Sequence, residues 1–225
     1  MTHHPSHEAN VLAEARTVVA AADAHENAIL AASRSFLRSE TVLFRELLSL
    51  LDAAIRLNLP VGDSQEQAAA ILASEHILED LLRHGWNGIL LGHYAGAGQC
   101  LRLIHECCDY IAAVPSSAEV ARKFLNEEKL ERSEVIKAIE QDLGTRDPQA
   151  FNQWNTKRLE VWQNLQATAH LSWFALELGA HTRHGRTFFG HDLNKRTALY
   201  LAVCYLDAAL YGTLCLGQAL QEPPA

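Results

Sequence analysis

The sequence lacks several features that would place the protein in a familiar functional class. Its 225 residues contain no uninterrupted apolar run of about 18 residues, so we expect no transmembrane helix. Cys-x-x-Cys pairs, a His-Glu-x-x-His motif and a Gly-x-Ser-x-Gly elbow are all missing, so the diagnostic zinc, metalloprotease and serine-hydrolase patterns find no support. Gly96-Ala97-Gly98 lies inside an expected helix and follows no strand, which excludes a phosphate-cradling glycine loop.

Positive charge is also scarce. The chain has 19 Lys and Arg against 27 Asp and Glu, and its formal net charge is -8 at pH 7. Such a balance disfavours a general affinity for phosphate backbones or anionic lipid, so we expect no membrane association and disfavour nucleic acid as a partner. The short basic pairs Lys157/Arg158 and Lys195/Arg196 are interpreted as solvated faces of helices.

The five cysteines are an odd number and form no Cys-x-x-Cys pair. Cys100 and Cys107, and likewise Cys204 and Cys215, share helical faces with apolar residues, as free thiols in protein cores do. The opening Met-Thr-His-His-Pro-Ser-His does not resemble a signal peptide, and we interpret residues 1–7 as a flexible tail. Together these observations favour a reducing, cytoplasmic environment.

Most of the chain shows the three- and four-residue apolar spacing of amphipathic helices. Caps, glycines and prolines separate the expected helical segments, which are 8–57 with a break at 33–39, 64–84, 87–114, 116–143, 147–170 and 194–220. The pattern predicts an all-α fold, an antiparallel bundle of six to eight helices that forms a single helical domain over 8–221.

The segment 170–191 concentrates the polar chemistry of the chain, with four histidines, one glutamate and two arginines. As a hairpin, it would form short strands at 171–178 and 187–191 around a turn that contains glycine. The turn glycines and the Phe188-Phe189 pair favour this hairpin. The helical alternative places four side chains on one face: His170, Glu177, His181 and His184.

Two enzymatic interpretations depend on this segment. Imidazole and carboxylate suit a divalent transition metal, which makes four residues candidate metal ligands: His170, Glu177, His181 and His184. The pair Arg186 and His191 resembles the Arg-x4-6-His motif of ribonucleases of the higher-eukaryote and prokaryote nucleotide-binding superfamily, which are helical bundles. The resemblance implies that His191 acts on the 2′-hydroxyl or the leaving oxygen and that Arg186 stabilises the phosphorane charge. A hydrolase of either kind is the alternative function.

A second polar group lies in the most apolar expected helix. Arg102 and Glu106 stand four residues apart, and we interpret them as a buried ion pair that fixes helix register. A more functional interpretation is a polar centre inside the bundle that binds a ligand or performs acid–base chemistry with His105 or Asp109. The candidate ligand-binding residues are Arg102, Glu106, His105, His93 and His170.

Two short motifs around this helix are similar to those of a group of uncharacterised bacterial helical proteins, which are domains of unknown function. Residues 101–106, Leu-Arg-Leu-Ile-His-Glu, resemble the Leu-Arg-x-x-x-Glu motif of the group, and 121–125, Ala-Arg-Lys-Phe-Leu, resemble its Ala-Arg-x-Phe/Trp-Leu segment. A helix that ends in His170, a short hairpin and a long final helix follow in the same order. The resemblance covers the chain from about residue 75 and implies an α-helical domain without an assigned activity.

The function that we favour from the sequence is therefore a non-enzymatic bundle that binds a ligand or a partner. Gly88, Gly92 and Gly96 follow one another at spacings of four and predict a flat stripe for close helix packing, in spite of their low helix propensity. This stripe and the apolar last helix are the surfaces through which we expect a homo-oligomer to form.

Overall fold

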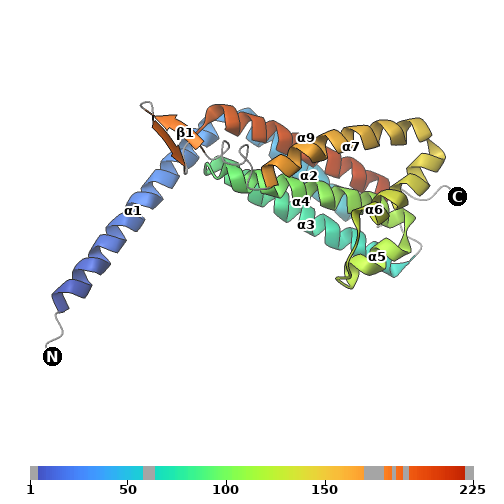
Figure 1. The fold of residues 1–225 in the computed structure, drawn as a ribbon, viewed down its shortest axis with the longest axis horizontal. Coiled ribbons are helices and arrows are strands. Elements are labelled where there is room, and N and C mark those ends of the chain that lie inside the picture. Colours follow the sequence, from blue (N-terminus) through green and yellow to red (C-terminus); the bar gives the residue numbers. More distant parts are fainter. Residues whose placement is uncertain (1–4, 58–63, 170–179, 184–185, 190–192, 221–225) are drawn as a thin grey trace.

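The computed structural model describes residues 5–57, 64–169, 180–183, 186–189 and 193–220, and it confirms the all-α helical bundle (Figure 1). In chain order the helices are α1 (Pro5–Phe36), α2 (Arg38–Leu57), α3 (Gln65–Leu90), α4 (Tyr94–Ala113), α5 (Ala118–Leu125), α6 (Arg132–Ile139), α7 (Pro148–Ala169) and α9 (Lys195–Ala219). The shorter elements are the 3-10 turn η1 (Val114–Ser116), the π-helical turn η2 (Glu140–Gly144), and the strands β1 (Ala180–Arg183) and β2 (Arg186–Phe189).

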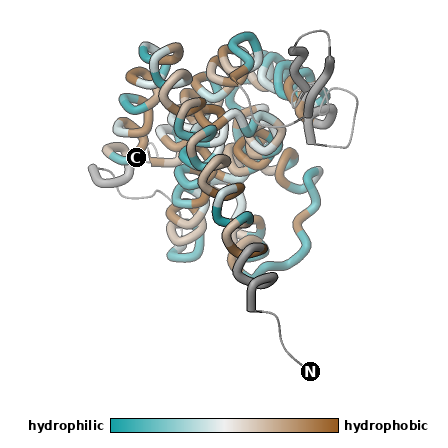
Figure 2. Tube along the Cα trace, turned by 90° about the vertical axis from the view of Figure 1, so that its left-hand side faces the viewer, coloured by the Kyte–Doolittle hydropathy of each residue, from teal (hydrophilic) through white to brown (hydrophobic). Residues whose placement is uncertain are grey.

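The centre of the bundle is formed by α3, α4 and α9, with α2 packed on α9 and α7 packed on α4. The two helices α4 and α9 run in the same direction. At one end the Asn194 backbone N–H donates to the Tyr94 hydroxyl at 3.1 Å, and further along Tyr211 donates to Asp109 at 3.4 Å. Viewed nearly end-on, the long helices pack around one another and α1 runs out of the group (Figure 2).

Side-chain caps start the helices where the sequence predicts them. The third helix begins after Ser64, whose hydroxyl accepts from the Gln67 backbone N–H at 3.2 Å. Gln67 is buried, and its amide donates to the Val114 carbonyl at 3.0 Å, which ties the start of α3 to the end of α4. The same cap geometry is present at three further helix starts, those after Ser117, Asp147 and Asn194.

The boundary between α3 and α4 differs from the prediction. The expected helix over 64–84 ends before Gly85, but α3 continues through this glycine to Leu90. A Cβ at Gly85 would lie 1.6 Å from the Tyr205 hydroxyl oxygen, so this glycine permits α9 to approach rather than stopping the helix. The chain turns instead at Gly92, which has a φ of 78° that favours glycine.

The expected continuous helix over 87–114 is therefore wrong, and its three glycines do not form one stripe. Gly88 belongs to α3 and faces Ala97 of α4, where a new Cβ would lie 3.5 Å from the Ala97 methyl. Gly96 lies on α4, and a Cβ there would meet no atom within 4 Å. Only Gly88 serves the close helix approach that the spacing predicts.

The N-terminal helices and the hairpin also refine the expected boundaries. The first helix begins at Pro5, so residues 5–7, expected in the tail, are helical. It ends at Phe36, inside the predicted break at 33–39. The two strands pair antiparallel with Arg183 opposite Arg186, so a helix over 180–183 and 186–189 is wrong. The predicted first strand, 171–178, lies outside the described residues, and the second strand is 186–189 rather than 187–191. This register leaves two residues between the strands, the shortest common hairpin connection.

In the part of the chain that the structure describes, α9 is the one helix long and apolar enough to cross a membrane by length and composition. Core helices of soluble bundles pass the same test, and 44% of the apolar window of α9 is buried in the bundle. The buried side includes Leu201, Tyr205 and Leu216, whereas Leu199, Val203 and other apolar residues are exposed. The helix thus combines a core face with an apolar outer face.

Candidate functional site

The polar centre of the molecule lies where α4, α6 and α7 meet. On α7, Trp154, Arg158 and Trp162 follow one another at spacings of four and share one face of the helix. This face packs against α4 so that Trp162 lies near Arg102, and Arg158 lies near Asp109. Two helices packed side by side thus bring charged and aromatic side chains into a single group.

Asp109 is the buried acid of this group, with only 3% of its surface exposed. One carboxylate oxygen accepts from Arg158 Nη1 at 3.3 Å and lies 3.8 Å from Arg132 Nη2, while the Tyr211 hydroxyl donates to the other at 3.4 Å. Tyr211 in turn accepts from Trp154 Nε1 at 2.9 Å. Burial raises the pKa of Asp109 to about 6, although the two arginines and Tyr211 act in the opposite direction.

Arg132, the first residue of α6, is the least satisfied member of the group. Its guanidinium carbon lies 3.1 Å from the centroid of the Trp162 ring, and that of Arg102 lies 5.1 Å from the same ring. Arg132 Nε and Nη2 are buried without a hydrogen bond, as is Arg158 Nε. Burial and the charge of Arg158 lower the pKa of Arg132 to about 10.

We call Arg102, Arg132, Arg158, Trp162 and Asp109 the arginine–tryptophan cluster. With Glu106, which bonds Arg102, the cluster holds three guanidinium groups and two carboxylates, and its local charge is positive in a chain with a net charge of -8. The cluster has more buried guanidinium N–H donors than hydrogen-bond acceptors within reach. An acceptor with negative charge would therefore complete it.

His105 belongs to the core beside the cluster. Its ring stacks on Tyr211, with 5.7 Å between centroids and 26° between planes. Burial lowers the pKa of His105 to about 4, with a smaller opposing effect from Asp207. At neutral pH the ring is uncharged, which suits packing better than proton transfer.

The structure corrects the expected burial of two charged groups. Arg102 Nε does contact Glu106 Oε1 at 3.2 Å, but the side chains are 32% and 30% exposed, so the buried-pair interpretation is wrong. The buried pair is Arg158 with Asp109, at 10% and 5% exposure. The solvated-face interpretation holds for Lys157, which is 81% exposed, and fails for Arg158 because neighbouring helical residues point about 100° apart.

The other candidate residues are not brought to the cluster within the described structure. His93 is the N-cap of α4, where its Nε2 lies 3.6 Å from Glu26 Oε1. His93 lies nine positions before Arg102, which is about 14 Å of helical rise. His181 and Arg186 lie on the two strands, for which only the backbone is described. The remaining candidates lie outside the described residues: His170, Glu177, His184 and His191.

The metal and ribonuclease hypotheses thus remain predictions. Among the described residues, no group of three or more His, Cys, Asp or Glu side chains is placed to hold a metal ion. Both hypotheses depend on side chains between 170 and 191, which lie outside that part of the structure.

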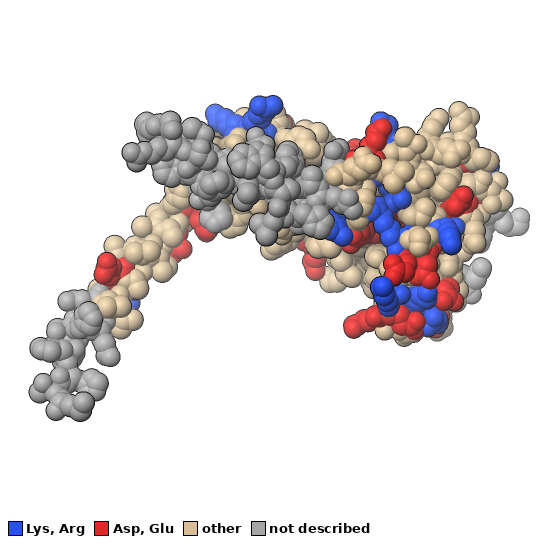
Figure 3. Space-filling model, viewed as in Figure 1, with Lys and Arg blue, Asp and Glu red and all other residues tan. Residues whose placement is uncertain are grey.

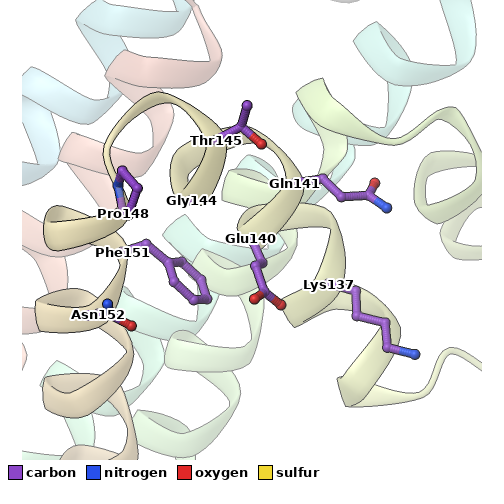
Figure 4. Close-up of a pocket in the computed structure, with 8 residues that line it drawn as sticks. All are labelled: Lys137, Glu140, Gln141, Gly144, Thr145, Pro148, Phe151 and Asn152. Carbon is purple, nitrogen blue, oxygen red and sulfur yellow. The ribbon is translucent and has the colours of Figure 1, made fainter.

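A hollow of about 500 Å³ lies between η2 and the start of α7, apart from the cluster (Figure 4). The Phe151 ring and the Glu140 carboxylate lie toward each other inside it, whereas Lys137 and Gln141 point outward. π-Helical turns are often found at functional sites. This hollow, however, holds no group of converging charged side chains of the kind seen in the cluster.

Sequence reasoning missed Arg132, Arg158 and Trp162. One signal was available, since Trp154-x-x-x-Arg158-x-x-x-Trp162 places an arginine between two indoles on one helical face. Arg132 gave no such signal, because its position depends on how α6 packs against α4.

A scan against protein-family models finds no matching family, and searches of curated proteins and of solved structures find no match either. The resemblance to uncharacterised bacterial helical domains therefore remains a prediction.

Proposed function

We propose that the protein is a non-enzymatic binding bundle and that its arginine–tryptophan cluster binds a small anionic ligand. One observation carries the proposal: Nε and Nη2 of Arg132, whose side chain reaches the surface, are buried without a hydrogen bond. Leaving such donors unpaired away from water is costly, so these atoms favour an acceptor that brings negative charge.

The exposure of the cluster indicates how the ligand would reach it. Arg102 and Arg132 each keep 32% of the side chain exposed, whereas Arg158 and Asp109 are closed off beneath them. A ligand would contact the outer guanidinium groups beside the Trp162 ring. Planar carboxylates and tetrahedral phosphate or sulfate groups match the donor geometry of arginine.

The ionisable groups around the cluster support binding rather than catalysis there. His105 is neutral and packed on Tyr211, and Asp109 is engaged by its arginine and tyrosine neighbours. Burial raises the pKa of the nearby Cys108 well above its usual value, which disfavours a thiolate nucleophile. The hydrolase alternative is not tested by the described side chains, because the side chains on which it depends lie outside them.

Titration calorimetry with sodium sulfate tests this proposal, since sulfate keeps its charge across the useful pH range. We expect saturable binding in the wild type, and Arg132→Gln should abolish it. Arg132→Lys should weaken it, because lysine keeps the charge but lacks the planar guanidinium donors. Lys157→Gln is the matched control, because it removes a cation from the exposed side of α7.

Circular dichroism of each variant separates loss of the site from loss of the fold. Folded Arg132→Gln protein that binds sulfate like the wild type would contradict the proposal. So would wild-type protein without saturable binding, or a Lys157→Gln variant that loses as much affinity as Arg132→Gln.

A further inference from the structure

The buried acid of the arginine–tryptophan cluster lies beside the group that would hold the ligand. Asp109 is 3% exposed, and one of its carboxylate oxygens lies 3.8 Å from Arg132 Nη2. At this distance the two charges attract each other, but no hydrogen bond forms, and Arg132 Nε and Nη2 stay without an acceptor. A bound anion would therefore share one guanidinium group with Asp109.

Sharing this guanidinium group brings two negative charges close together. Each charge disfavours the ionised form of the other, and burial leaves little water near Asp109 to screen the repulsion. Sulfate and other strong-acid anions keep their charge near neutral pH. Asp109 is the partner that can become neutral, by taking up a proton on a carboxylate oxygen.

We propose that the cluster binds its anion together with a proton, which Asp109 takes up. This inference rests on the proposed function and adds a dependence on pH to the same site. The coupling works in both directions. Protonation of Asp109 removes one of the two carboxylate charges of the site and leaves Arg132 and Arg158 free to attract the ligand, while the bound ligand makes protonation easier.

Ionisable groups reach Asp109 from α4 itself and from the three helices that pack on this side of it. They are Cys108 and Tyr110 of α4, Arg132 of α6, Arg158 of α7, and Tyr211 and Cys215 of α9. The helix α3 packs against the other side of α4, where Cys107 donates to a carbonyl of α3. Residues two positions apart in a helix point about 160° apart, so Asp109 faces away from α3.

Asp109 is the member of this group that can titrate near neutral pH. Burial raises the pKa of Asp109 to about 6, and it raises the pKa of Cys215 to about 12. Burial also lowers the pKa of Arg132 to about 10 and that of the neighbouring His105 to about 4. Of these four residues, only Asp109 changes its charge between pH 5 and pH 8. The affinity for the anion should therefore rise as the pH falls through about 6.

Titration calorimetry of the full chain with sodium sulfate, from pH 5 to pH 8 at constant ionic strength, tests the coupling. We expect an affinity about tenfold higher at pH 5 than at pH 8, because a rise of one unit in the pKa of Asp109 on binding corresponds to a tenfold change in affinity. Carbon-13 NMR of the Asp109 carboxyl follows the proton directly. Saturating sulfate should raise the pKa of Asp109 in the wild type.

Asp109→Asn keeps the shape of the side chain and removes the titrating carboxyl. Its sulfate affinity should be nearly constant between pH 5 and pH 8, close to that of the wild type at pH 5. Glu75→Gln is the matched control. Glu75 is also buried, 7% exposed, but no arginine is among the charges that act on it, so this variant should keep the wild-type pH dependence. If Asp109→Asn does not fold, the NMR titration of the wild type decides.

Failure of the coupling and failure of the proposed function give different results. Absence of saturable sulfate binding at both pH 5 and pH 8 would overturn the proposed function and the coupling with it. Saturable binding with equal affinity at both pH values would overturn the coupling alone, as would an Asp109 pKa that sulfate leaves unchanged. An Asp109→Asn variant with the wild-type pH dependence would also overturn it, because another group would then take up the proton.

Discussion

Two charged regions of this molecule each contain an ion pair, and the pair with the shorter distance is the less buried of the two. Over α5 and α6, acidic and basic side chains crowd the surface (Figure 3), and Lys123 Nζ lies only 2.6 Å from Glu134 Oε1. In the arginine–tryptophan cluster, Arg158 contacts Asp109 at the longer distance of 3.3 Å. The Lys123–Glu134 pair keeps 18% and 39% of its side chains exposed, so water partly screens it, whereas the cluster pair cannot be broken without stranding a buried charge. Burial rather than distance decides which pair the fold needs.

The largest effect is expected for Asp109→Ala. The change leaves Arg158 buried and Arg132 partly buried without their acid, which typically costs about 3–5 kcal/mol of unfolding free energy. Urea denaturation followed by circular dichroism measures it. The double variant Asp109→Leu/Arg158→Met should regain much of the loss, because it leaves fewer stranded charges. Equal stability of wild type and Asp109→Ala would show that water reaches the cluster and that the contrast with the surface is wrong.

Glu75 is a second buried acid, 7% exposed, and can be compared with Asp109. Unlike Asp109, it has no arginine or lysine among the charges that shift its pKa. Burial, followed by the charge of Glu79, raises its pKa from 4.5 to about 7. The folded protein therefore holds this proton more tightly than the unfolded chain, and the stability falls as the pH rises from about 4.5 to about 7. Glu75→Gln should remove that slope and stabilise the fold by about 3 kcal/mol at pH 8.

Urea midpoints of wild type and Glu75→Gln, measured from pH 4 to pH 8, test this expectation. The two curves should converge near pH 4, where the glutamate is protonated in both states, and separate above it. Parallel curves across the whole range would show that Glu75 is hydrated and titrates normally.

The pair Arg102–Glu106, whose side chains are 32% and 30% exposed, should matter less than the buried pair. Arg102→Ala removes one hydrogen bond of 3.2 Å and one contact with the Trp162 ring. Each is worth about 0.5–1 kcal/mol at a partly exposed site, so we expect a loss of about 1 kcal/mol in urea denaturation. Glu106 can turn to water in the variant. A loss as large as that of Asp109→Ala would restore the buried-pair interpretation drawn from the sequence.

The sequence predicted features that depend on residues close together in the chain better than features that depend on residues far apart. The helix starts at Ser64, Ser117 and Asn194 were predictable because a cap and its helix are adjacent in the chain. The role of Gly85 was not, because it is set by Tyr205, far away in the sequence. A glycine that ends a helix and one that admits another helix look alike in the sequence.

The same limit explains the candidate site. The sequence identified Arg102, Glu106 and Asp109 as polar residues of one apolar helix, and the structure places all three around one centre. Which of them is buried depends on α6 and α7. These helices supply Arg132, Arg158 and Trp162. The periodicity of the α4 sequence does not indicate where they pack.

The smallest effect is expected at the surface, where Glu134→Gln removes the acid that contacts Lys123. The hydrogen bond from Lys123 lowers the pKa of Glu134, yet both side chains keep some exposure, 18% and 39%, so water can replace the lost contact. We expect no measurable change in the urea midpoint at low ionic strength and none in about 1 M NaCl, where the Debye length is about 3 Å. Glu134 also accepts from the Glu131 backbone N–H at 3.0 Å as part of the helix cap, and glutamine keeps that acceptor. Glu134→Ala, which removes the cap as well, is the informative control. If Glu134→Gln proved as costly as Glu134→Ala, the charge itself would stabilise the surface, and the contrast with the arginine–tryptophan cluster would fail.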